Sequence, residues 1–128
     1  MKKIKKIAAS IMAVAAMTTS LASFTASAQT IADNYSEFTW NKSGTSVSVS
    51  LKNTSGSQRR ASVFIMGYDQ YGNYAGSMGN ENNINDGESV SASGNLYYSV
   101  KSASFSGTMY STTLPYGTPL SNYYKTIG

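Results

Sequence analysis

The strict alternation of apolar and polar residues over 45–52 is the feature that most restricts the fold of this chain. Apolar side chains occupy every second position, at Val47, Val49 and Leu51, and serines occupy the positions between them. A helix would scatter these side chains around its axis, whereas a strand places all the apolar ones on one face. The alternation therefore predicts a β-strand that packs one face against a hydrophobic core.

Similar short segments recur along the chain and are separated by residues that favour turns. We expect further strands at 37–40, 60–68, 74–78, 88–93, 96–101 and 103–110. Clusters of Gly, Asn, Asp and Ser lie between them, as at 53–57 and 69–73, and the polar segment 79–85 is expected to form a loop. No window shows the pattern of a long amphipathic helix. Short strands with turns roughly every 8–12 residues predict a β-sandwich or a small β-barrel.

The same periodicity predicts the surroundings of particular residues. Phe38 and Trp40 are two positions apart, so they share a strand face and are expected in the core. Residues 60–68 carry apolar side chains on both faces, which is typical of a central strand covered on both sides. The basic doublet that ends in Arg60 is expected at an exposed sheet edge, where charge discourages edge-to-edge pairing. The segment 111–128, rich in Pro, Gly and Tyr, is expected to be ordered only if it packs on the sandwich.

The N-terminal segment has the three parts of a bacterial secretory signal peptide. Lysines predominate over residues 2–6, an apolar run covers 7–17, and a small-x-small site ends at Ala28. The apolar run is shorter than the ~20 residues that a membrane-spanning helix requires. We therefore expect cleavage between Ala28 and Gln29, and a secreted chain of residues 29–128 that forms a single domain.

The net charge of +4 comes from this N-terminal segment. It holds four of the 10 basic residues and none of the 6 acidic ones, so the rest of the chain is neutral on balance. A neutral chain lacks the positive surface that a phosphate backbone requires, and nucleic-acid binding is not expected. No second long apolar run follows, so no membrane span is expected either.

The chain contains no Cys and no His. Thiolate and imidazole catalysis, disulfides and zinc clusters are therefore excluded. A pair of carboxylates could in principle hydrolyse a glycoside, but the carboxylates Asp69, Glu81, Asp86 and Glu88 lie at or beside turns, where they commonly accept hydrogen bonds from local backbone amides. We expect neither enzymatic activity nor a cofactor.

Three segments together resemble the FxLYD-type immunoglobulin-like domains of bacterial secreted proteins. They are the strand and turn at 47–56, the segment 62–72 with its aromatic–Asp pair before a Gly turn, and the Asp-Gly-Glu segment at 84–91. The pair Gly67-Tyr68 stands where the family has Leu-Tyr. The resemblance covers roughly residues 45–110 and implies an immunoglobulin-like antiparallel β-sandwich of about 6–8 short strands. It also implies an accessory or interaction module without catalytic residues.

Tyrosines are the candidate ligand-binding residues, because Tyr combines an apolar ring with a polar tip. Tyr68, Tyr71 and Tyr74 flank the predicted turn at 69–73. Adjacent residues of a strand face opposite ways, so Tyr97 and Tyr98 would place one ring on each face. Ordinary strand packing also favours Tyr. The tyrosines at the turn are the better candidates, since packing demands least there.

A calcium site is a weaker candidate. The segment 80–88 is rich in the oxygen ligands that Ca²⁺ prefers, and Glu81, Asp86 and Glu88 are its acidic residues. Aligning Gly87 with the glycine of an EF-hand loop places Ile84 at a ligand position, so the EF-hand pattern fails. A solvated Asn/Gly loop explains the composition equally well, and no metal is predicted.

The sequence thus favours a secreted, non-catalytic binding or interaction module of a bacterial cell surface or its surroundings, with an extracellular protein or glycan as partner. Two alternatives stay open. One is a carbohydrate-binding module. The other is a small secreted effector, either a bacteriocin-like toxin or an inhibitor of an extracellular enzyme.

Overall fold

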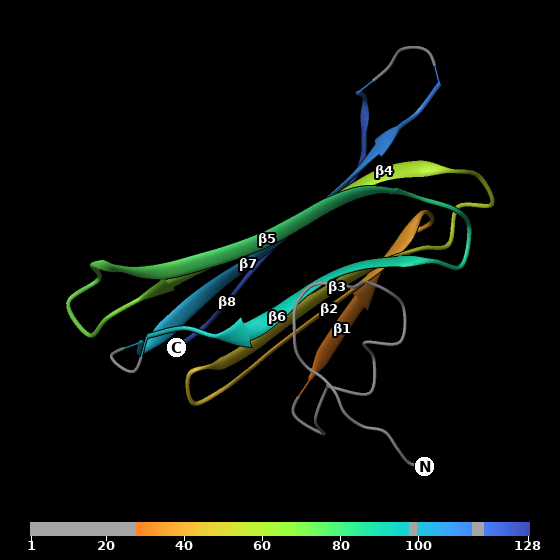
Figure 1. Cartoon of the computed structure of the whole chain (residues 1–128). Coiled ribbons are helices and arrows are strands. Elements are labelled where there is room, and N and C mark those ends of the chain that lie inside the picture. Colours follow the sequence, from red (N-terminus) through yellow and green to blue (C-terminus); the bar gives the residue numbers. More distant parts are fainter. Residues whose placement is uncertain (1–27, 98–99, 114–116) are drawn as a thin grey trace.

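The computed structural model describes residues 28–97, 100–113 and 117–128, and within them it contains β-strands and no helix (Figure 1). The strands are β1 (Gln29–Ala32), β2 (Ser36–Ser43), β3 (Ser46–Asn53), β4 (Arg59–Tyr68), β5 (Tyr74–Ile84), β6 (Ser89–Asn95), β7 (Ser102–Ser111) and β8 (Pro119–Ile127). No helix able to cross a membrane occurs in this described part. The predicted all-β class is confirmed.

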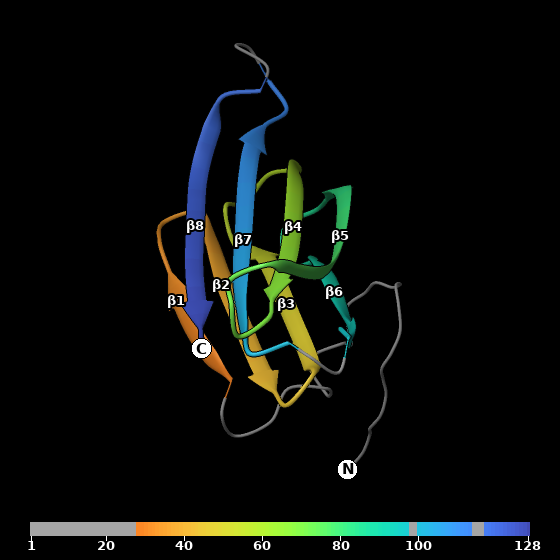
Figure 2. The same ribbon diagram turned by 90° about the vertical axis from the view of Figure 1, so that its left-hand side faces the viewer.

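The strands form two antiparallel sheets that pack face to face as a sandwich. The first sheet has the order β1-β2-β3-β6 and the second has the order β5-β4-β7-β8. Figure 2 shows the second sheet in front and the first behind it. The connections β3–β4, β5–β6 and β6–β7 each pass from one sheet to the other. Counted from β2, this is the connectivity of an immunoglobulin constant-type sandwich, except that β5 pairs with β4 and not with β6.

One hydrophobic core fills the space between the sheets, and the alternation in β3 creates part of it. The three apolar residues Val47, Val49 and Leu51 are all buried, as predicted. Phe38 and Trp40 of β2 are also buried, which confirms their predicted shared face. Alternate residues of the second sheet complete the core, namely Ala61, Val63, Ile65, Ala103, Phe105, Met109 and Tyr123.

An aromatic stack at Phe38 joins the two sheets. The Phe38 ring lies parallel to the ring of Tyr123, with centroids 5.0 Å apart, and 5.5 Å from the ring of Trp40. Gly107 of β7 lies beneath it, and a Cβ atom there would be 2.6 Å from Cε1 and 2.7 Å from Cδ1 of Phe38. The absence of a side chain at Gly107 therefore lets a ring of the first sheet pack directly on the backbone of the second.

A buried polar cluster beside this stack links the start of β2 to β8. The Ser36 hydroxyl donates to Ser121 Oγ at 2.8 Å and lies 2.9 Å from Tyr123 Oη. Burial raises the pKa of Tyr123. Asp33 accepts hydrogen bonds from the backbone amides of Tyr35 and Ser36. Desolvation raises the pKa of Asp33, but hydrogen bonds from Ser121 and these amides lower it more, and the net shift is downward.

Two predictions about β4 and β5 were wrong. The polar segment 79–85 was expected to be a loop, yet β5 continues to Ile84. It can do so because, among the strands that the structure describes, β5 is at the end of its sheet and pairs with β4 alone, so polar side chains can face solvent along it. Strand β4 is central, as predicted, but its outer face is not covered, because Phe64 on that face is 41% exposed.

The predicted strand at 96–101 was also wrong for the residues described there. Leu96 and Val100 belong to the β6–β7 connection, and both are buried. They pack over Gly67, where a Cβ atom would be 2.6 Å from Leu96 Cδ1 and 3.2 Å from Val100 Cγ2. These apolar residues therefore close one end of the core instead of extending a sheet.

The C-terminal segment forms a regular strand. Within 111–128, strand β8 pairs antiparallel with β7 from Tyr110–Pro119 to Ala103–Ile127, with one irregularity next to Met109. Tyr123 of this strand is in the core. Residues 119–127 therefore pack on the sandwich, which is the condition that the sequence analysis set for an ordered C-terminal segment.

Candidate functional site

The outer face of the second sheet is the most distinctive surface of the molecule. Residues directly opposite each other in an antiparallel sheet point to the same side, so the register defines rows of outward side chains across all four strands. We call this surface the aromatic face. Its rows are Asn83–Arg60–Tyr110–Pro119, Glu81–Ser62–Thr108–Asn122, Gly79–Phe64–Ser106–Tyr124, Ser77–Met66–Ser104–Thr126 and Tyr74–Tyr68–Ser102. Figure 2 shows the four strands that carry them.

Aromatic rings occur in every second row of this face. The first row holds Tyr110, the third holds Phe64 and Tyr124, and the fifth holds Tyr68 and Tyr74. Phe64, Tyr124 and Tyr74 are 41%, 66% and 61% exposed. Successive rows are two residues apart along a strand, so aromatic rows recur about every 13 Å. The face therefore presents three spaced aromatic contacts along the strands.

Hydroxyl and amide groups fill the rows between the rings. The second row carries Ser62, Thr108 and Asn122, and the Thr108 hydroxyl donates to Asn122 Oδ1 at 3.2 Å. The fourth row carries Thr126 and the serine Ser77 as accessible hydroxyls, together with Met66 and with Ser104, which is buried. Each aromatic row is thus flanked by groups that can donate and accept hydrogen bonds.

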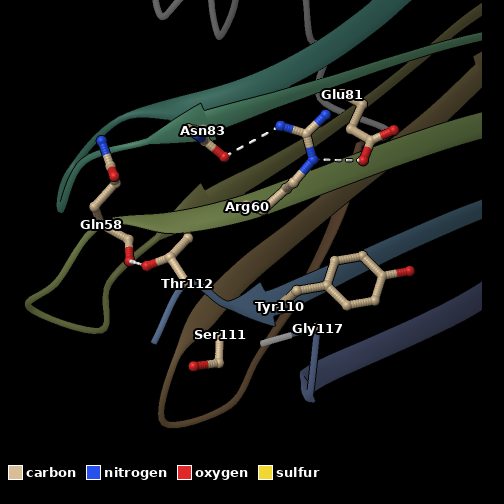
Figure 3. A pocket seen from close by; sticks show the side chains of 8 residues that line it. All are labelled: Gln58, Arg60, Glu81, Asn83, Tyr110, Ser111, Thr112 and Gly117. Carbon is tan, nitrogen blue, oxygen red and sulfur yellow. Dashed lines mark hydrogen bonds and ion pairs between the residues drawn. The ribbon is translucent and has the colours of Figure 1, made fainter. Parts of the chain in front are cut away.

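A pocket of about 550 Å³ opens at the first row. Figure 3 shows the residues around it, which are Gln58, Arg60, Glu81, Asn83, Tyr110, Ser111, Thr112 and Gly117. Arg60 donates through Nε to Glu81 Oε2 at 2.7 Å and through Nη1 to Asn83 Oδ1 at 3.2 Å. On the other side of the pocket, the Thr112 hydroxyl donates to the Gln58 carbonyl at 2.7 Å. The pocket falls within the usual size range of small-ligand sites.

The aromatic face carries no net charge. Arg60 and Glu81 are the charged residues of its rows, and they form an ion pair with each other. Their side chains are 47% and 49% exposed, so both remain accessible to a ligand. A smaller pocket of about 260 Å³ lies at the opposite end of the face, where Tyr68, Ser102 and Thr126 line it.

The tyrosines that the sequence analysis proposed for ligand binding lie in different parts of the structure. Tyr68 and Tyr74 lie on the aromatic face, and the Tyr74 hydroxyl is 2.9 Å from Ser77 Oγ. Tyr97 belongs to the β6–β7 connection and to none of the rows, and its ring lies over Gly76 of β5, where a Cβ atom would be 3.6 Å from Cδ2 and Cε2 of the ring. Tyr98 is outside the described residues.

Tyr71 lies in the turn beyond the end of the aromatic face and is 77% exposed. Asp69 organises this turn, because its Oδ1 accepts hydrogen bonds from the backbone amides of Tyr71 at 2.8 Å and Asn73 at 2.9 Å. The bond from Asn73 is the largest cause of the lowered pKa of Asp69. Gly72 has a φ of 83°, a conformation that favours glycine. The turn predicted at 69–73 is therefore confirmed, with Tyr71 at its tip.

The three acidic residues proposed for calcium do not converge. Glu81 pairs with Arg60, Asp86 accepts the Gly56 amide at 2.9 Å, and Glu88 accepts the Asn85 amide at 2.7 Å. Among residues 28–97, 100–113 and 117–128, no group of three acidic side chains is placed to hold a metal ion. Each carboxylate instead stabilises the structure near it.

The sequence analysis did not select Phe64, Tyr124, Tyr110 or Arg60 as binding residues. Phe64 was taken as covered, although the polar residues at Arg60 and Ser62 already mark that side of the strand as outward. Arg60 was expected at a sheet edge, but it lies on the central strand β4. Glu81 of the neighbouring strand β5 neutralises the charge of Arg60. The sequence of β8 does not tell which of the adjacent Tyr123 and Tyr124 is outward, and the structure buries Tyr123 and exposes Tyr124.

Comparison with known proteins gives no functional assignment for this chain. No protein-family model matches it, and no curated protein matches its sequence significantly. Its function is therefore inferred from the surface that the described residues form.

Proposed function

We propose that this protein is a secreted, non-catalytic binding module of a bacterial cell surface or its surroundings, and that it binds an extracellular protein or glycan through the aromatic face. The observation that carries the proposal is the placement of aromatic rows alternating with hydroxyl rows on one open sheet face. Its secretion rests on the signal peptide expected at residues 1–28.

Exposed rings on rigid strands support this proposal. Phe64 and Tyr124 lie in one row on β4 and β8 and retain large exposed fractions. Aromatic residues are the side chains that most often anchor a bound partner, because they bury much apolar area with little loss of rotamer freedom. Strands hold such residues in fixed positions better than loops do. A role in binding explains why these aromatic rings are exposed to solvent on this face.

The carboxylates support a role without catalysis. A general acid in glycoside hydrolysis needs a raised pKa. Asp33 and Asp69 have shifted pKa values, and both are shifted downward by hydrogen bonds. Glu81, which is nearest to the larger pocket, is already paired with Arg60. All three carboxylates hold or orient neighbouring residues, and the hydrogen bonds to Asp33 and Asp69 favour their ionised state.

A binding assay on cells and on extracellular material tests the proposal. The purified protein is compared with the variant Phe64→Ser/Tyr124→Ser, which removes the central rings of the aromatic face. The matched control is Tyr35→Ser/Tyr97→Ser, which removes two exposed rings, 37% and 67% exposed, outside the rows of that face. Thermal unfolding establishes that all three proteins are folded.

We expect the unmodified protein and the control to bind to the cells or the extracellular material. We expect the Phe64→Ser/Tyr124→Ser variant not to bind. Equal retention of all three would show that the aromatic face is not the contact surface. The variant Tyr71→Ser tests the turn separately, because Tyr71 lies beyond the fifth row and is not expected to be needed.

A further inference from the structure

The dimensions of the aromatic face suit an elongated ligand. Its rows span residues 60–68 of β4, a length of about 26 Å, and four strands side by side give a width of about 14 Å. The two pockets lie at opposite ends of this length. A small molecule would contact one pocket and leave the remaining rows unused, whereas an extended chain can contact all of them.

The sequence of rows matches the surface chemistry of a sugar chain. A sugar ring has an apolar face of C–H groups and an edge of hydroxyls. The ring of Phe64 or Tyr124 can stack on the apolar face. Ser62, Thr108 and Asn122, one row away, can donate to and accept from the hydroxyls. The centre of a protein–protein interface is, by contrast, depleted of serine.

The charges on the face exclude strongly charged ligands. Arg60 and Glu81 neutralise each other, and the other residues of the rows are uncharged. An acidic polymer needs an excess of positive charge on the protein, and a basic one needs an excess of negative charge. The ligand that complements this face is therefore neutral.

The larger pocket adds a polar contact at the end of the face. Arg60 uses Nε and Nη1, and Glu81 uses Oε2, for the bonds that hold the pair and Asn83 together. Among the described residues, Nη2 of Arg60 and Oε1 of Glu81 take part in neither of these bonds, so one remains as a donor and the other as an acceptor for a ligand. Neighbouring hydroxyls of one sugar need that combination.

From these observations we propose that the aromatic face binds an uncharged polysaccharide that lies along the strands of the second sheet. Its sugars stack on Phe64 and Tyr124, and one sugar at the Arg60 end places its hydroxyls against the Arg60–Glu81 pair. This inference rests on the proposed function and specifies its ligand.

Retention by immobilised polysaccharides tests the ligand class. The probes are neutral polymers (β-1,4-glucan, xylan, mannan and starch) and acidic ones (polygalacturonate and heparin). We expect the purified protein to bind at least one neutral polymer and no acidic one. The dissociation constant is expected to change less than about twofold between low and high salt, because no net charge is neutralised on binding.

Variants then test the contact residues. Phe64→Ser and Tyr124→Ser are each expected to weaken binding to the retained polymer on the order of tenfold, whereas Tyr97→Ser stays within about twofold. Glu81→Gln removes the negative charge that neutralises Arg60 and leaves the face with a net positive charge. It should not strengthen neutral binding, but it would strengthen the binding of an acidic ligand.

Binding to acidic polymers alone, or neutral binding that Phe64→Ser and Tyr124→Ser leave unchanged, would overturn the inference. If no polysaccharide is retained while the Phe64→Ser/Tyr124→Ser variant still loses a protein partner in the cell assay, the ligand class is wrong and the proposed function stands. If neither assay distinguishes that variant from the unmodified protein, both are wrong.

Discussion

The substitution Gly107→Ala tests how closely the two sheets approach at the aromatic stack. The added methyl group would lie 2.6 Å and 2.7 Å from two ring carbons of Phe38. Carbon atoms in optimal contact are about 3.5–4.0 Å apart, so the ring or the strand must move by about 1 Å. Phe38 is fully buried and stacked against Tyr123 and Trp40, so it has no open space to enter.

The expected cost follows from this overlap. Inserting a methyl group into a well-packed core typically costs about 1–3 kcal/mol, and a clash with a fully buried ring belongs at the upper end. The better strand propensity of Ala offsets about 0.5–1 kcal/mol of it. We therefore expect a net loss of about 2 kcal/mol in the free energy of unfolding. For a domain of this size, that lowers the Tm by about 8–16 °C.

Urea unfolding followed by tryptophan fluorescence measures this loss, because Trp40 is the only tryptophan and is buried in the affected stack. The matched control is Gly94→Ala. There a Cβ atom would be 3.2 Å from Cε and 3.4 Å from Sδ of Met78, the flexible end of a side chain that can move aside. We expect the control to stay within about 0.5 kcal/mol of the unmodified protein.

A double-mutant cycle isolates the contact between the methyl group and the ring. Phe38→Leu removes the ring atoms that the methyl group meets, so the combined Gly107→Ala/Phe38→Leu protein should lose less stability than the two single losses added together. The expected coupling is about 1–2 kcal/mol. Additive losses, or a Gly107→Ala protein as stable as Gly94→Ala, would refute the close approach of the sheets at this point.

Three further predictions concern other parts of the chain. Burial raises the pKa of Tyr123 above its ordinary 10.0, so the neutral phenol adds stability below pH 10.0 that is lost as the pH rises through the folded-state pKa. Urea midpoints measured across this range should fall less in Tyr123→Phe than in the unmodified protein. Asn53 is fully buried and donates to the carbonyls of Ser57 and Ile84, so Asn53→Ala should lower the free energy of unfolding by about 2–3 kcal/mol, measured by urea titration. Mass spectrometry of protein exported by a bacterial host should give the mass of residues 29–128, and an uncleaved chain would contradict the predicted signal peptide.

The strands that the sequence predicted well are those with a local signal. In β3, Val49 and Leu51 alternate with serines, and this pattern specifies strand, face and core together. Strand β5 was predicted poorly, because it lacks such a local signal. Its second half is polar and was expected to be a loop, because its strand conformation depends on hydrogen bonding to β4 and on exposure at the end of the sheet.

The candidate site was predictable only in part. The turn tyrosines were identified from composition, and Tyr68 and Tyr74 do lie on the aromatic face. Phe64 was assigned to a covered face although Arg60 and Ser62 on the same side are polar, because Phe64 and Met66 make the rest of that side apolar. Arg60 was expected at an edge, since its partner Glu81 lies on a different strand whose pairing the sequence does not state.

By itself, the sequence determined that this chain forms strands, which alternate residues enter the core, and that thiolate and imidazole chemistry is absent. These properties follow from residue identity and from a period of two along a strand, both of which are local. Only the tertiary structure decided that Phe64 and Tyr124, far apart in the chain, share one row. That arrangement depends on which strands pair and in which register, and pairing is decided by hydrogen bonds and packing between distant segments.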